Sequence, residues 1–168
     1  MVSRAARAIG LIAVCAALAA CGYHLRGMGD TALSFTTVAI EGGDNDPLLV
    51  ERVKDTFSRA NITVVKEGFE RQVKILGANQ TRKASAVDAG GNVAIYALDY
   101  VMTFSFLDAE GAPLLENAQV AAHREYEFNE QEILGKDEEQ QLLLREMRGD
   151  LARDMLRRIS RAERNRSG

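Results

Sequence analysis

The alternation of apolar and polar residues is clearest between residues 92 and 107. One set of alternate positions there is large and apolar, and the intervening set is small or polar. Because successive side chains of a strand point to opposite faces, this period of two predicts a strand with one face on the core. The apolar set is Tyr96, Leu98, Tyr100, Met102, Phe104 and Phe106.

Two further stretches, 71–87 and 114–128, have strand composition and flank this central one. Turn-forming segments separate the three, at residues 88–91 and 108–111. Such short connections favour antiparallel pairing, so we expect a meander with one face on the core. Shorter stretches at 34–40 and 62–65 are also rich in strand-forming residues.

A helical pattern begins after Asp46. Pro47 suits the first position of a helix and Asp46 suits its N-cap. Apolar residues then recur at helical spacing, and Asn61 is a typical left-handed residue after a helix end. The apolar stripe of this predicted helix is Leu49, Val53, Phe57 and Ala60.

A second, longer helix is predicted from about residue 138 to residue 162. Asp137 can cap it, with Gln140 three residues further on as in a capping box. Gly149 lies in its middle, where glycine costs up to about 1 kcal/mol relative to alanine, so it indicates a close packing contact. The apolar stripe is Leu144, Met147, Leu151, Met155 and Ile159. These elements predict an α+β domain in which two helices cover one face of a small sheet.

The N-terminus has the organisation of a signal peptide. Arg4 and Arg7 precede an uncharged run, 8–20, that is shorter than the roughly 20 residues a membrane-spanning helix needs. Leu18-Ala19-Ala20-Cys21 resembles the lipobox of bacterial lipoproteins. The alternative is an ordinary secretory signal that ends near a cysteine. Cys21 lies at the predicted cleavage point, which favours acylation of its thiol.

Acylation at Cys21 has consequences for the mature chain. Cys15 leaves with the signal peptide, so the mature chain has no thiol left for a disulfide. Gly22, rather than Asp, after the lipidated residue is similar to the pattern sorted to the outer membrane. More than one acyl chain gives stable membrane anchoring. We therefore divide the chain into a signal peptide (1–20), a lipidated tether (21–33), one α+β domain (34–163) and a short tail (164–168).

Charge limits the classes of ligand. The chain has 21 Lys and Arg against 24 Asp and Glu, and removing Arg4 and Arg7 leaves a formal net charge of −5. A mildly acidic domain is not a general binder of nucleic acid, so an anionic ligand must meet a local basic cluster. The absence of Trp excludes a tryptophan-lined sugar site.

The sequence offers no catalytic set. His24 lies three residues from the lipid anchor. His123 falls on a predicted strand, on the face opposite Val120, Ala122 and Tyr126, where it is expected to be solvent-exposed or packed on the sheet. The sequence contains no nucleophile elbow, no phosphate-binding loop, no dinucleotide-binding fingerprint and no metal-ligand spacing. Asp137 and the two glutamates after it are interpreted as helix-start charges. The sequence therefore predicts no enzyme, no cofactor and no metal.

Three basic residues are candidates for ligand binding. Arg82 and Lys83 are neighbours in a predicted strand, so they point to opposite faces and cannot line one site together. Lys136 stands just before the predicted second helix, where a cation gains nothing from the helix dipole. Composition alone favours solvated surface charge for all three.

Three segments together resemble the LptE family of lipopolysaccharide-assembly lipoproteins. They are Cys21–Gly27 directly after the lipobox, Tyr96–Tyr100 in the central strand, and Tyr126–Met147, which runs through Lys136. The resemblance extends over most of the mature chain. It implies a fold of two helices on a four-stranded, mostly antiparallel sheet.

The resemblance also implies a role and a site. Members of this family sit as a plug in the outer-membrane β-barrel LptD, support its assembly and bind lipopolysaccharide. Their lipopolysaccharide-contacting basic residue falls on Lys136. A second basic residue, at the tip of the central hairpin, is replaced by the acidic segment 88–91, which leaves Arg82 or Lys83 as substitutes. The alternatives are a stand-alone lipid carrier and a small lipoprotein hydrolase, for which the sequence supplies no nucleophile–base pair.

Overall fold

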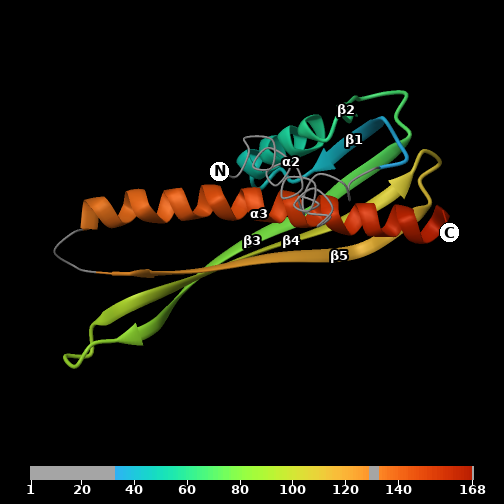
Figure 1. Cartoon of the computed structure of the whole chain (residues 1–168). Coiled ribbons are helices and arrows are strands. Elements are labelled where there is room, and N and C mark those ends of the chain that lie inside the picture. The colour runs from blue at the N-terminus through green and yellow to red at the C-terminus, as the bar shows by residue number, and fades with distance from the viewer. Residues whose placement is uncertain (1–32, 129–132, 168) are drawn as a thin grey trace, which may run out of the picture. The chain divides into compact units, whose positions relative to one another are not determined.

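The computed structural model describes residues 33–128 and 133–167, with the side chains of the last helix described from residue 137 to residue 166. Figure 1 shows the arrangement of the helices and strands in these residues. In chain order they are β1 (Thr37–Gly42), α2 (Pro47–Arg59), β2 (Thr63–Val64), β3 (Arg71–Val87), β4 (Val93–Asp108), β5 (Pro113–Glu127) and α3 (Ile133–Ser167).

The strands form one mixed sheet in the order β2-β1-β3-β4-β5. β3, β4 and β5 pair antiparallel as the expected meander, whereas β1 runs parallel to both β2 and β3. The α+β class is confirmed, but the expectation of four strands is wrong. The fifth strand is β2, which is only two residues long and returns beside β1 after the crossover helix α2, as parallel pairing requires.

The apolar face of β4 lies under both helices (Figure 1). Leu98, Tyr100, Met102, Phe104 and Phe106 are all buried, as their alternation predicted, and Tyr96 is half-buried. Side chains from α2 and α3 complete the same core, and each large apolar side chain that is fully buried contributes about 1.5–3 kcal/mol. The helix contributions are Leu49, Val53, Phe57, Leu144, Met147, Leu151, Met155 and Ile159.

The ends of α2 follow the sequence signals, whereas the start of α3 does not. The Asp46 carboxylate accepts a hydrogen bond from the Leu49 amide at 3.1 Å, and Asn61 has a φ of 61°, as predicted. α3 begins at Ile133, so the prediction that Asp137 caps a helix starting near residue 138 is wrong. The apolar stripe marks the part of a helix that packs on the core, and α3 extends beyond that part at both ends.

A β-bulge in β3 changes which residues face the helices. Ile75 pairs with Phe104 and Gly77 with Thr103, which leaves Leu76 as an extra residue that is 54% exposed. One inserted residue reverses the alternation of a strand. Val73 therefore faces the helices before the bulge, and Arg82 faces them after it.

Candidate functional site

Two buried carboxylates of the domain, Asp46 and Glu163, are each paired with an arginine. Asp46, 7% exposed, accepts hydrogen bonds from the Tyr100 hydroxyl and from Arg148 Nε at 3.0 Å. Burial by itself would raise the pKa of Asp46, but the hydrogen bonds from Tyr100, Arg148 and the Leu49 amide outweigh it and lower the pKa. Burial, followed by the bond to Asp46, raises the pKa of Tyr100 to about 12. This network joins α2, β4 and α3 and leaves no acid or base free for catalysis among its members.

A second buried carboxylate holds the far end of α3. The Glu163 carboxylate accepts a hydrogen bond from Arg71 Nε at 2.8 Å and another from the Ser34 hydroxyl. Burial opposes its ionisation, but the bonds from Arg71 and Ser34 keep the pKa of Glu163 below its usual value. The interaction joins the last turns of α3 to the start of β3 and to the beginning of the described chain.

Arg82 and Lys83 lie on opposite faces of the sheet. The Arg82 guanidinium stacks 4.6 Å above the Tyr96 ring and donates to Gln140 Oε1 at 3.0 Å, while Tyr126 donates to the same oxygen at 2.9 Å. Lys83 pairs with Ala97 on the face away from α3 and is exposed. Arg82 is therefore engaged by the protein itself, and Lys83 is available to solvent.

Two of the predicted functional residues have no described side chain. Cys21 lies in residues 1–32, outside the described residues. Lys136 belongs to the first turn of α3 rather than to the segment before the helix, because α3 begins at Ile133. Its side chain is outside the described part, so its role as a lipopolysaccharide contact stays a prediction.

Asp88, the acidic residue at the tip of the β3–β4 hairpin, has a structural role in the turn. One of its carboxylate oxygens accepts hydrogen bonds from the amides of Gly90 at 2.8 Å and Asn92 at 2.9 Å. The bonds from Asn92, more than any other cause, lower the pKa of Asp88. The carboxylate thus closes the turn, which is an intramolecular role.

The face of the sheet opposite the helices carries small and polar side chains. His123 Nδ1 lies 2.8 Å from Asp99 Oδ1, and 58% of the His123 side chain is exposed, as its strand position predicted. Across the described ranges, no group of three His, Cys, Asp or Glu side chains gathers as a possible metal site. None of the described helices is long and apolar enough to cross a membrane.

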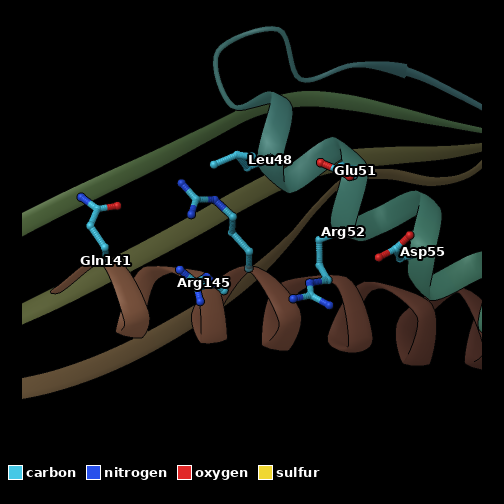
Figure 2. Close-up of a pocket in the computed structure, with 7 residues that line it drawn as sticks. Leu48, Glu51, Arg52, Asp55, Gln141 and Arg145 are labelled. Atoms are coloured by element: carbon cyan, nitrogen blue, oxygen red, sulfur yellow. The ribbon is translucent and has the colours of Figure 1, made fainter. Parts of the chain in front are cut away.

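A groove between α2 and α3 is the feature that the sequence did not reveal. It consists of two hollows of about 300 and 260 Å³ that share Arg52. Figure 2 shows the first hollow, with Leu48, Glu51, Arg52 and Asp55 on α2 facing Gln141 and Arg145 on α3. The basic residues come from segments far apart in the chain, and no local motif marks them.

The fold defines a class of small α+β domains that carry two helices on one face of a mixed sheet, and this class includes solved lipoproteins. Lipoprotein B from Nitrosomonas europaea superimposes with a TM-score of 0.69 at 25% identity, over 83% of this chain and 90% of that one. The rare lipoprotein B from Shewanella oneidensis gives a TM-score of 0.70 at 21% identity, over 79% and 99% of the two chains.

The chain belongs to the LptE family. The family model, described as LptE, lipopolysaccharide-assembly, matches residues 35–159. LPS-assembly lipoprotein LptE from Pectobacterium atrosepticum is 23% identical over 84% of this chain and 77% of its own length. The protein of the same name from Photorhabdus laumondii is 24% identical over 84% and 78%. The family resemblance of the sequence is therefore confirmed, and the family is not a class of enzymes.

Proposed function

We propose that this chain is a non-enzymatic lipoprotein of the outer membrane, anchored through an acylated Cys21, that plugs the LptD β-barrel. In this position it helps the barrel to assemble and binds lipopolysaccharide during export to the cell surface. The proposal is supported by membership of the lipopolysaccharide-assembly family and by relatives that are named LPS-assembly lipoproteins.

The packed apolar core is the observation that distinguishes a plug from a stand-alone lipid carrier. A carrier needs a cavity that shields acyl chains from water. Here the apolar face of β4 is filled by side chains of its own helices, and Tyr100, Met102 and Phe104 are fully buried. The groove between the helices is lined mainly by charged residues. This arrangement covers the apolar face with the chain's own side chains and favours the plug.

The opposite face of the sheet suits the wall of a barrel. The interior of outer-membrane barrels is polar, so a plug that contacts it needs a surface of small and polar side chains. β4 presents Asp99, Thr103 and Ser105 on this face, all partly exposed, with Gln119 beside them on β5. We call this surface the open face and propose that it contacts the barrel wall.

Lys136 is the leading candidate for contact with lipid A phosphates. A cation–phosphate hydrogen bond is about twice as strong as a neutral one. Arg82 would first have to leave Tyr96 and Gln140, and Lys83 lies on the opposite face. We expect Lys136→Glu to weaken lipopolysaccharide binding while the circular dichroism spectrum stays native, with Lys83→Glu as the charge-matched control. Unchanged binding in Lys136→Glu would remove Lys136 from the site.

The plug proposal is tested by purification through a C-terminal tag from detergent-solubilised outer membranes. We expect the large barrel to be recovered in 1:1 ratio with this chain. Recovery of the processed chain free of any barrel, with bound phospholipid or lipopolysaccharide, would favour the carrier instead. In the same preparation, Cys21→Ala is expected to lower the yield of the complex through defective maturation, and a normal yield would show that acylation is dispensable.

A further inference from the structure

We propose that the groove between α2 and α3 binds a carboxylate-bearing polypeptide segment of the barrel partner. This inference rests on the proposed function, because it assumes that the barrel encloses the domain. We call this surface the arginine groove. It is lined by five arginines, two from α2 and three from α3: Arg52, Arg59, Arg145, Arg148 and Arg153.

The groove is elongated because its two hollows lie side by side and share Arg52 and Asp55. Arg52 lines both hollows, one toward Arg145 and the other toward Arg153. In Figure 2, Arg52 extends from α2 toward α3, and Arg145 lines the same hollow from α3. A surface of this form follows an extended chain segment better than a compact ion.

The positive charge in the groove is only partly neutralised. Arg148 pairs with Asp46 at 3.0 Å, and Arg153 pairs with Asp150 at 2.5 Å. The guanidinium groups of Arg52, Arg59 and Arg145 have no ion pair or hydrogen bond within the described residues. Gathering like charges costs Coulomb energy that a bound anion would relieve.

Gly149 lies beneath two arginines of this groove and is itself buried. A Cβ at this position would lie 3.2 Å from Arg153 Nη1 and 4.0 Å from Arg52 Nε, and no backbone of another element comes that close. The close packing contact that this glycine indicated in the sequence is one with arginine side chains. The atoms above Gly149 belong to the side chains of Arg153 and Arg52, which converge over the helix backbone and cover it.

The groove favours carboxylates of a polypeptide over a lipid phosphate. The guanidinium fork matches a carboxylate through two parallel hydrogen bonds. Glu51 and Asp55 also line the groove, and they would repel a dianionic phosphate more strongly than a singly charged carboxylate. Leu48, 59% exposed at the same hollow, offers an apolar contact of the kind that a peptide side chain would use.

The test compares two double charge reversals in the full, lipidated chain. Arg52→Glu with Arg145→Glu reverses two unpaired arginines of the groove. The control, Lys54→Glu with Arg161→Glu, makes the same change in charge at exposed positions of α2 and α3 outside the groove. We expect the groove variant to recover about tenfold less barrel through the C-terminal tag than the control does. Lipopolysaccharide per recovered complex is measured in parallel.

The outcomes separate this inference from the proposed function. Equal barrel recovery in both variants would overturn the groove and leave the plug intact. Normal barrel recovery with less bound lipopolysaccharide would also overturn the inference and assign the groove to lipid phosphates. A wild-type chain that recovers no barrel would refute both. If the reversed variant fails to fold by circular dichroism, the neutral pair Arg52→Gln with Arg145→Gln replaces it, with the same ordering of recoveries expected.

Discussion

The two faces of the sheet differ in burial, and we assign them different roles: one holds the core and the other contacts a partner. On the helix-covered face, Tyr100, Met102 and Phe104 are completely buried. On the open face, their immediate neighbours Val101, Thr103 and Ser105 are partly exposed. The difference arises from single-residue alternation along one strand. Most of the buried apolar surface that stabilises the fold lies on the covered face. The residues of the open face are therefore less constrained by folding and can match a partner.

The largest effect should come from deleting a side chain on the covered face. Phe104→Ala removes a fully buried ring and is expected to lower the free energy of unfolding by about 3–5 kcal/mol. Thr103→Ala, one residue away on the open face, should change it by less than about 1 kcal/mol. Urea unfolding of the acyl-free mature chain measures both, and equal losses would remove the distinction between the faces.

The next effect concerns the ionised carboxylate under α3. Asp46→Asn leaves Arg148 buried with no charged partner, and we expect a loss of about 3 kcal/mol. Asp154→Asn is the control, because its pair with Arg157 lies on the surface and is worth about 0.5 kcal/mol or less.

The pH dependence of this effect has a definite sign. The folded pKa of Asp46 lies below its unfolded value of 3.8, so the ionised carboxylate stabilises the fold fully above pH 3.8. That contribution is lost as the pH falls through the folded pKa. The stability difference between wild type and Asp46→Asn should be constant from pH 7 to about 5 and shrink below pH 3.8. A difference that grows on acidification would show that Asp46 is protonated in the fold.

The smallest effect should be a gain. Gly149→Ala improves helix propensity by up to about 1 kcal/mol, and the new Cβ displaces only the flexible end of Arg153. We expect a slightly higher urea midpoint together with no increase in barrel recovery, because the methyl group lies beneath the groove arginines and adds no charge to them. A lower urea midpoint would mean that a closer contact exists at this glycine.

Much of this fold could be predicted because its strands are long and regular. The alternation from Tyr96 to Phe106 fixed the covered face, and Asp46 with Pro47 located the start of α2 to the residue. The short strand at 62–65 was predicted from its composition, but its place in a five-stranded sheet was not, since its parallel pairing with Thr37 and Val38 is long-range.

The candidate site was less predictable for physical reasons. The bulge at Leu76 reverses the alternation of β3, so it decides that Arg82 and not Lys83 meets Tyr96 and α3. The arginine groove depends on how α2 crosses α3, which no local pattern in either helix encodes. Cys21 was recognised from its local motif alone and stays a prediction, since it lies outside the described residues.

The most direct test of the account is a photo-crosslinking residue at Thr103, at the centre of the open face. In living cells the account predicts an ultraviolet-dependent adduct between this chain and the barrel, recovered through the C-terminal tag. The same residue placed at Phe104, where the side chain is buried under the helices, should give no barrel adduct. A processed, folded chain that forms no barrel adduct from Thr103 would contradict the claim that the open face contacts the barrel wall.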